Sequence, residues 1–208
     1  QGIIKNIGFS THGDNGAIVK TINYDCFDFV NLHYYYFNQM NREAVELASK
    51  KDMGVLIISP NDKGGQLWNP SEKVKDACKP LSAISFNGRY CLSHKEVTTL
   101  TMGFHEDDHF TEPLNILNNN KYGEDDPVYT KILNTMDSFR DDSPVDSCIT
   151  CYKCLPCPEK IHIPEVLRMY DMDQFYDMKD FGKYRYNMFQ EDDHWFAGRF
   201  ANNCTECG

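Results

Sequence analysis

Short runs of apolar and β-branched residues alternate with helical patterns along the first half of the chain. Four of these runs, each bounded by polar or glycine-containing turns, predict strands at residues 3–9, 27–32, 55–58 and 97–102. Between the second and third runs, residues 40–48 place Met40, Ala44 and Val45 among apolar positions with the 3.6-residue period of a helix. Strands that alternate with helices at this spacing are typically parallel and joined by right-handed crossovers. The pattern therefore predicts an α/β fold with about four parallel strands.

The rest of the chain predicts helices and loops. Residues 78–94 predict a longer, interrupted helical connection before the fourth strand. Residues 118–127 are polar and turn-rich and predict a surface loop or linker, and a helix is expected at residues 128–140. A further helix should begin near Pro164, because proline is well tolerated at a first helical position. This divides the chain into an α/β part at 1–118, a linker and helix at 119–140, and a small, mostly helical segment at 141–208 that is rich in cysteine.

Composition limits the classes of protein to consider. The chain has 208 residues, of which 41% are hydrophobic and 13% aromatic, enough for a folded core. Its formal net charge of -10 opposes a phosphate backbone, and there is no basic stripe with interleaved aromatics, so we expect no nucleic-acid binding. No run reaches the roughly 18 apolar residues of a membrane span, and no secretory signal opens the chain. We therefore expect a cytoplasmic protein that does not bind membranes.

Six of the nine cysteines fall in two closely spaced groups, which is typical of metal or cluster ligation. The first group spaces its thiols by two residues throughout and is followed by Pro158; it consists of Cys148, Cys151, Cys154 and Cys157. Such a loop wraps around a 4Fe-4S cluster, whereas a zinc site usually joins two separated pairs, so we favour the cluster over zinc and over disulfides. Cys204 and Cys207 match the opening of a second motif of this type, so one or two clusters are possible, or the pair binds nothing. Cys26, Cys78 and Cys91 are expected to be small buried side chains.

Polar residues follow each predicted strand, where parallel α/β folds bind their ligands. They lie at residues 10–12, 31–34, 59–65 and 103–105. Residues 61–65 combine backbone donors with Lys63, which suits a pyrophosphate, although an ordinary strand-to-helix turn has the same composition. His12, His33 and His105 are candidate ligands or proton donors, or ordinary histidines at loop ends.

The chain resembles the iron–sulfur-containing branch of the aldo-keto reductase family in several segments. These are residues 2–13, 27–34, 54–60 and 182–187, together with the motif from Cys148 to Pro158. The family fold is a (β/α)8 TIM barrel. The resemblance implies that the chain forms half of such a barrel, its last four strand–helix units, followed by a ferredoxin-like iron–sulfur segment.

The resemblance also implies a nicotinamide cofactor, usually NADPH, across the strand ends. By position, the residues that match those holding the carboxamide group of the nicotinamide are Ser10, Thr11 and Asn31. The loop that matches the pyrophosphate site contains Ser59, Pro60, Asn61, Lys63 and Gly64. The chain departs from the family in two places. Ile58 stands where many relatives stack a tyrosine on the nicotinamide, and the acidic residues 106–108 follow the last strand, where relatives often have basic groups for the 2′-phosphate. NADH, or no nucleotide, is therefore an alternative to NADPH.

The family's catalytic tyrosine and its aspartate, lysine and histidine partners belong to the first four units, so no residue here matches them. By itself the chain is not expected to reduce a carbonyl. A half barrel has two open edges, which predicts a homo-oligomer or a missing N-terminal half as its partner.

Three functions remain open. The leading hypothesis is the C-terminal portion of an NAD(P)H-dependent oxidoreductase in which the 4Fe-4S cluster relays electrons. The alternative is a non-catalytic electron-transfer module that docks a redox partner protein through its acidic surface. The third is a structural protein stabilised by zinc.

Overall fold

A computed structural model describes residues 2–118, 121–189 and 198–207. The chain divides into two compact units, which we call the sheet unit and the helical unit. The sheet unit comprises Gln1–Asn69 and Cys78–Leu133, and the helical unit comprises Pro70–Ala77 and Asn134–Gly208.

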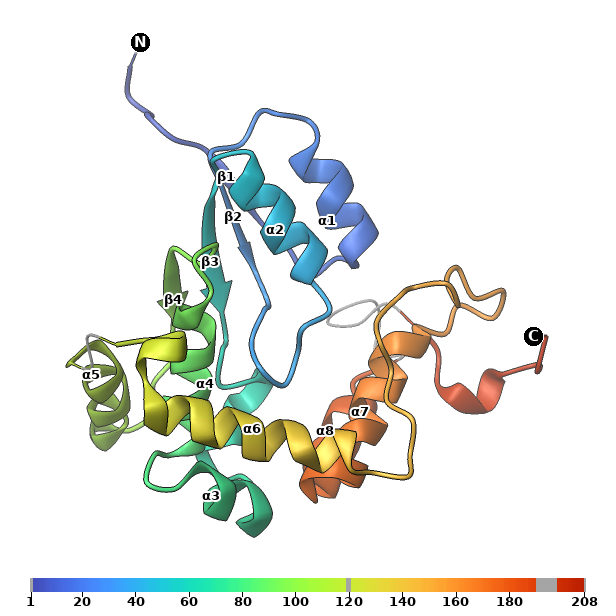
Figure 1. The fold of residues 1–208 in the computed structure, drawn as a ribbon. Coiled ribbons are helices and arrows are strands. Elements are labelled where there is room, and N and C mark those ends of the chain that lie inside the picture. The colour runs from blue at the N-terminus through green and yellow to red at the C-terminus, as the bar shows by residue number, and fades with distance from the viewer. Residues whose placement is uncertain (1, 119–120, 190–197, 208) are drawn as a thin grey trace. The chain divides into compact units, whose positions relative to one another are not determined.

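The sheet unit contains one four-stranded sheet in which every strand pair is parallel (Figure 1). Its strands are β1 (Gly8–Ser10), β2 (Phe29–Leu32), β3 (Gly54–Ile58) and β4 (Thr99–Thr101), and their order in the sheet follows their order in the chain. The prediction of an α/β fold with about four parallel strands is confirmed. The first strand is shorter than predicted, because pairing with β2 begins only at Gly8 and leaves Ile3 and Ile4 exposed.

Helices connect the strands, as the alternating pattern predicts, and one further helix, which was not predicted, follows the last strand. They are α1 (Asn15–Ile22), α2 (Arg42–Lys50), α4 (Ala83–Ser93) and α5 (Thr111–Asn118). Capping side chains define where two of them begin: Asp14 accepts the Ala17 N–H at 2.8 Å at the start of α1, and Ser82 accepts the Ser85 N–H at 2.9 Å at the start of α4. In α2, Ala44, Val45 and Ala48 are buried, as the predicted apolar face requires.

Two helices lie at or before the interrupted connection predicted at residues 78–94: α3 (Glu72–Cys78), which ends where that range begins, and α4 within it. The first begins earlier than predicted and ends just before Lys79 and Pro80. Proline has no N–H to continue the helical hydrogen bonds, which explains the interruption. Short 3₁₀ turns occur before α3, at η1 (Lys63–Trp68), and before α5, at η2 (Asp107–Phe110).

The two faces of the sheet differ in burial. The strand register places Val30, Leu32, Val55 and Ile57 on one face, and all four are buried. The opposite face carries Phe29, Asn31, Leu56 and Ile58, which are only partly buried. Right-handed crossovers that always step to the next strand in the same direction place every connecting helix on one face. In Figure 1, α1 and α2 lie together on one side of β1, β2 and β3.

The helical unit is built around α7 (Ile163–Tyr176) and α8 (Lys179–Tyr186), which pack against each other. α7 begins beside Pro164 as predicted, with the His162 side chain accepting the Glu165 N–H at 3.3 Å. The predicted helix at 128–140 is α6 (Pro127–Asp141), whose residues belong to both units. A glycine permits the close approach of α7 and α8, because a Cβ at Gly182 would lie 2.6 Å from the Met169 carbonyl oxygen.

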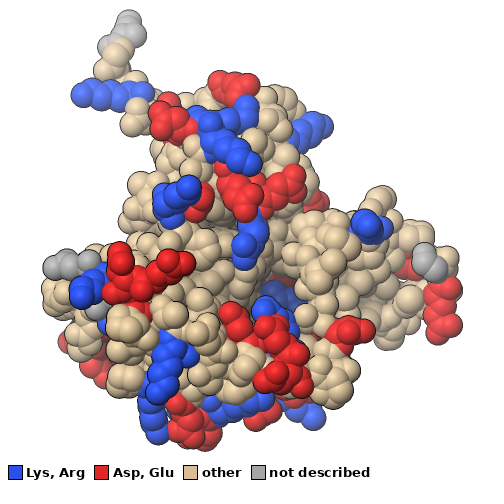
Figure 2. All heavy atoms as spheres, in the orientation of Figure 1, with Lys and Arg blue, Asp and Glu red and all other residues tan. Residues whose placement is uncertain are grey.

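Surface charge and helix composition bear on possible partners. Within the described residues, no helix is both long and apolar enough to cross a membrane. Figure 2 shows lysine and arginine interspersed with aspartate and glutamate over the face in view, with no continuous basic surface there.

Candidate functional site

The four cysteines of the first motif lie outside helices and strands, in the stretch between α6 and α7. Cys151 and Cys154 are exposed, and Cys148 and Cys157 are partly exposed. All four are free thiols, as are Cys204 and Cys207. Their sulfur atoms are therefore available to bind iron or zinc.

The backbone has the same local geometry after the first cysteine of each motif. The Thr150 N–H donates to Cys148 Sγ at 3.4 Å, and the Glu206 N–H donates to Cys204 Sγ at the same distance. Thr150 and Glu206 both have left-handed backbone angles, with φ of 51° and 52°. Such a conformation costs a non-glycine residue about 1 kcal/mol or more. Its repetition at two thiols indicates that the chain is shaped to bring an amide donor to each sulfur.

The first motif also turns sharply at its other cysteines. Tyr152 is left-handed, with φ of 57°, and its carbonyl accepts the Leu155 N–H at 3.0 Å. The Cys157 carbonyl accepts the Lys160 N–H at 2.9 Å, so the chain turns again after the last thiol. Four thiols on a repeatedly turning loop, followed by Pro158, are a donor set that fits an iron–sulfur cluster.

The segment that carries the second pair is fixed beside the end of this loop. The Arg199 N–H donates to the Lys160 carbonyl at 2.9 Å, and the Arg199 guanidinium lies 3.7 Å from Glu159. The Ala201 N–H donates to the Tyr186 hydroxyl at 2.8 Å, which ties the segment to the end of α8. Cys204 follows directly after η4 (Ala201–Asn203). The two cysteine motifs thus belong to one connected structure within the helical unit.

Asp171 of α7 contacts the first cysteine, which the sequence did not predict. Its carboxylate accepts the Cys148 N–H. Burial raises the pKa of Asp171 to about 6, against the opposing effects of this bond and of Arg140 and Arg168. Burial is also the main cause that raises the pKa of Cys148. Asp171 therefore fixes the start of the cysteine loop to α7.

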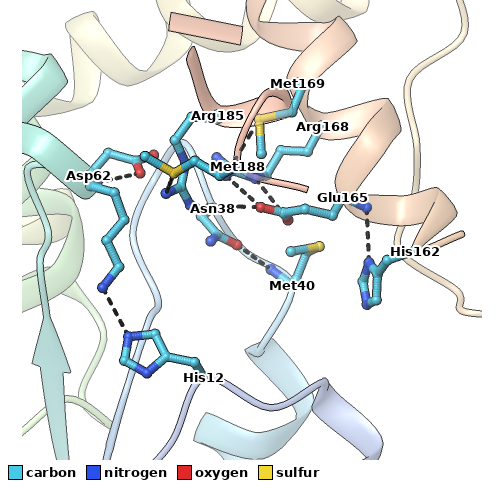
Figure 3. Close-up of polar contacts among 11 residues, drawn as sticks. His12, Asn38, Met40, Asp62, His162, Glu165, Arg168, Met169, Arg185 and Met188 are labelled. Atoms are coloured by element: carbon cyan, nitrogen blue, oxygen red, sulfur yellow. Dashed lines mark hydrogen bonds and ion pairs between the residues drawn. The ribbon is translucent and has the colours of Figure 1, made fainter. Parts of the chain in front are cut away.

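A buried ionic cluster joins α7 to α8 (Figure 3). Arg168 donates to both carboxylate oxygens of Glu165, from Nη2 at 2.8 Å and from Nε at 3.2 Å. Arg185 of α8 lies 3.9 Å from the same carboxylate. All three residues are buried, so these charges interact with little screening by water. Only the three-residue spacing of Glu165 and Arg168 could have suggested part of this cluster from sequence.

At the carboxyl edge of the sheet, the structure brings together the residues that match a carboxamide site. Ser10 and Asn31 are register partners, and the Thr11 N–H donates to the Asn31 carbonyl at 3.2 Å. Ser59 follows the last residue of β3. The Asn31 side-chain oxygen is buried and has no hydrogen-bond partner among the described residues. An unsatisfied buried oxygen is costly, and a ligand amide would satisfy it.

The loop at residues 59–65 uses three of its backbone donors internally. The Asp62 N–H donates to the Ser59 carbonyl at 2.9 Å, and the Asp62 carboxylate accepts the Lys63 N–H at 2.6 Å. The Gly65 N–H donates to the Asp62 carbonyl at 3.0 Å. Pro60 and Asn61 are buried, and neither polar atom of the Asn61 side chain has a partner in the described part of the chain. The groups of this loop that could bind a ligand are therefore the side chains of Lys63 and Asn61 more than a set of backbone N–H donors.

Two residues singled out separately in the sequence contact each other. Lys63 Nζ lies 2.9 Å from His12 Nε2, a bond drawn in Figure 3. The His12 ring also lies 5.1 Å from the His33 ring. The loops after three successive strands thus contribute a lysine and two imidazoles to one place. His105 belongs to a different cluster, after β4, where its N–H donates to His109.

The residues after β4 hold a candidate cation site. The ligand atoms of Glu106, Asp108 and His109 lie within 4.8 Å of one another, the only such group of three in the part of the chain that the structure describes. Glu106 and Asp108 are exposed, and His109 stacks on Trp68 at 3.8 Å. Exposed acidic groups are common without an ion, so this cluster does not by itself indicate a function.

No protein-family model matches the chain, and no curated protein matches it.

Proposed function

We propose that the chain is the C-terminal portion of an NAD(P)H-dependent oxidoreductase of the aldo-keto reductase type, in which a 4Fe-4S cluster relays electrons. The observation that carries the proposal is the repeated geometry at the two cysteine motifs, where an amide two residues on donates to the first thiol. This geometry supports thiolate ligation in both motifs rather than in the first alone. The four parallel strands, with helices expected on one face only, support the half barrel.

Cys148, Cys151, Cys154 and Cys157 would hold the cluster, with Cys204 and Cys207 as ligands of the same or a second one. A bound cluster supplies one-electron transfer. The protein would hold the thiols in place. Amide donors at Thr150 and Glu206 stabilise negative sulfur, and Asp171 fixes the backbone of Cys148.

The nucleotide would lie across the carboxyl edge of the sheet. Asn31 presents a buried oxygen that needs a donor, and a carboxamide N–H is one. Lys63 and His12 offer a donor and positive charge to a phosphate. The rest of the nucleotide-binding surface would be formed by Ser10, Thr11, Ser59, Pro60, Asn61 and Gly64. The exposed acids at 106–108 favour NADH over NADPH, because they would repel a 2′-phosphate.

Titration calorimetry of the pure chain with NADH and with NADPH tests the nucleotide part. We expect binding that Lys63→Ala weakens about tenfold, since a charge-assisted hydrogen bond contributes about 1.5 kcal/mol or more. Lys50→Ala, at the end of α2, is the matched control and should bind as the wild type does. If neither nucleotide binds, or if both variants bind equally well, the nucleotide site is wrong.

The second candidate is a non-catalytic electron-transfer module. The loop at residues 59–65 favours it, because three of its backbone N–H groups bond within the loop and are not open to a phosphate. The net charge of -10 would suit docking to a basic redox partner. Iron and sulfide are expected under both proposals, so nucleotide binding separates them.

A further inference from the structure

A buried side chain of α4 bonds to the loops that follow two neighbouring strands. Asn87 is 0% exposed. Its oxygen Oδ1 accepts the Tyr36 N–H at 3.0 Å, in the loop after β2, and its nitrogen Nδ2 donates to the Pro60 carbonyl, in the loop after β3. Because a backbone N–H can only donate and a carbonyl can only accept, these partners fix the orientation of the amide. Asn87 thus joins two loops that are distant in sequence.

Other contacts of α4 hold Asn87 in place against the loop after β2. The Cys91 thiol donates to the Tyr34 carbonyl at 3.5 Å. The Tyr36 ring packs edge-on against the Phe86 ring, with 5.0 Å between the centroids. All of these residues are buried. The helix and this loop therefore form one packed region, and the second bond of Asn87 extends it to the loop after β3.

The loop after β3 has a backbone that needs such support. Ser59 and Asp62 have φ of 48° and 60°, and Asp62 combines its angle with a ψ of 165°. Residues that carry a Cβ rarely adopt these angles and keep them only where the surrounding structure holds them. Pro60, which follows Ser59, is buried, so removing the Asn87 donor would take a hydrogen-bond partner from a buried carbonyl. The bond to Asn87 therefore stabilises the observed shape of this loop.

We propose that Asn87 is a positioning residue, which couples the carboxamide end and the phosphate end of the nucleotide site. The inference rests on the proposed function, in which Asn31 of β2 takes the carboxamide and Lys63 after β3 takes a phosphate. Asn87 fixes the loops that continue from these two strands, so both ends of the site are held in one arrangement before the nucleotide arrives. A ligand loses less affinity to ordering when its site is already formed. Asn87 acts through the two loops and needs no contact with the nucleotide.

Hydrogen exchange of the wild-type chain, followed by NMR, tests the coupling directly. Inorganic pyrophosphate is the probe, because it can occupy the phosphate end of the site but has no carboxamide. At ten times its Kd we expect pyrophosphate to slow exchange of the Asp62 N–H, in the loop that it binds, by about tenfold. Exchange of the Tyr36 N–H, in the loop that it does not bind, should slow with it, because Asn87 connects the two.

The variant Asn87→Asp separates the two bonds. Aspartate keeps an oxygen for the Tyr36 N–H, but its carboxylate has no donor for the Pro60 carbonyl. Pyrophosphate should no longer slow exchange at Tyr36. NADH, which would contact both ends of the site, should bind about tenfold more weakly in titration calorimetry, the equivalent of one lost hydrogen bond. The variant Asn87→Leu has a similar shape and no charge, and it should weaken NADH binding by as much, which excludes repulsion by the new carboxylate as the cause.

Thr98→Val is the matched control. Thr98 Oγ1 accepts the Val55 N–H at 3.0 Å, so this variant also removes a bond from a side chain to the backbone. Val55 is at the start of β3, at the opposite end of the strand from the loop that contains Pro60. The control should bind NADH as the wild type does and keep the response of the Tyr36 N–H to pyrophosphate.

Two results would overturn the proposal and leave the nucleotide site intact. One is pyrophosphate binding that leaves exchange of the Tyr36 N–H unchanged in the wild type, and the other is NADH binding by Asn87→Leu as tight as by the wild type. The first result needs no variant, so it decides even where a substitution at Asn87 prevents folding. A chain that binds neither NADH nor pyrophosphate would instead remove the nucleotide site of the proposed function, and its positioning residue with it.

Discussion

Replacing Glu165 by glutamine tests whether the buried ionic cluster holds the helical unit together. Glutamine keeps the shape of the side chain and one oxygen acceptor but removes the negative charge. That charge contacts Arg168 at 2.8 Å and lies 3.9 Å from Arg185, and all three residues are buried. The variant therefore leaves two buried guanidinium groups without the carboxylate that they share.

The expected loss of unfolding free energy is about 3 kcal/mol. Removing one partner of a buried ion pair costs about 3–5 kcal/mol, and the amide oxygen that glutamine retains places this variant at the lower end. The chain offers a matched control with the same three-residue spacing in the same unit. Glu72 and Lys75 of α3 lie 2.8 Å apart, but the Glu72 side chain is 83% exposed. Glu72→Gln should cost no more than about 0.5 kcal/mol, because water screens that pair.

Urea unfolding followed by far-UV circular dichroism measures both variants on the metal-free chain. We expect the Glu165→Gln midpoint to fall clearly and the Glu72→Gln midpoint to stay near that of the wild type. Equal midpoints for the two variants would refute the argument that burial makes the Glu165 contacts strong.

Three other changes have defined outcomes. Gly182→Ala should cost about 2 kcal/mol in urea unfolding, because the new Cβ would lie 2.6 Å from the Met169 carbonyl oxygen; Gly16→Ala in α1, which meets only the flexible Asp14 carboxylate at 3.3 Å, should cost nothing. A thiol reagent at mildly alkaline pH should modify seven of the nine cysteines in the metal-free native chain. Cys78 and Cys91 should not react because they are buried, and burial raises the pKa of Cys78 to about 12. Reaction of all nine cysteines before unfolding would contradict their burial. Asp171 has a pKa of about 6 in the folded chain and 3.8 in the unfolded chain, so between these pH values the folded state binds a proton that the unfolded state has lost. The free energy of unfolding of the metal-free chain should therefore fall by about 1 kcal/mol as the pH rises from 4 to 6, after allowance for the partial exposure of Asp171. In Asp171→Asn, unfolding curves should no longer show this loss of stability between about pH 4 and 6. A pH dependence equal to that of the wild type would exclude Asp171 as its cause.

The fold was predictable from sequence where the apolar pattern was sufficient. The apolar and β-branched runs at residues 27–32 and 55–58 identify central strands, and the structure pairs both as expected. The start of the first strand was wrong, because Ile3 and Ile4 are apolar but have no neighbouring strand in the described chain. An apolar run shows that a segment favours burial but does not identify the surface that buries it.

The candidate site, like the fold, could be predicted from sequence only in part. The spacing of the cysteines predicts a ligand set from sequence alone, because closely spaced thiols on one short loop are typical of cluster ligation. In the described part of the chain, no three of their sulfur atoms lie within 4.8 Å of one another. The contact between His12 and Lys63 joins residues 51 apart, and the Arg185 contact with Glu165 depends on how α7 packs against α8. Neither follows from a local pattern, since both depend on the tertiary structure.

The content of iron and acid-labile sulfide in anaerobically prepared protein tests the cluster most directly. We predict brown protein with both present, loss of most of the colour and iron in Cys151→Ala, and no change in Cys26→Ala. The Cys26 thiol is exposed, so the burial expected from sequence is wrong, and it lies in the sheet unit, outside both motifs. A colourless preparation with zinc and no sulfide, or unchanged iron in Cys151→Ala, would contradict the assignment of this loop.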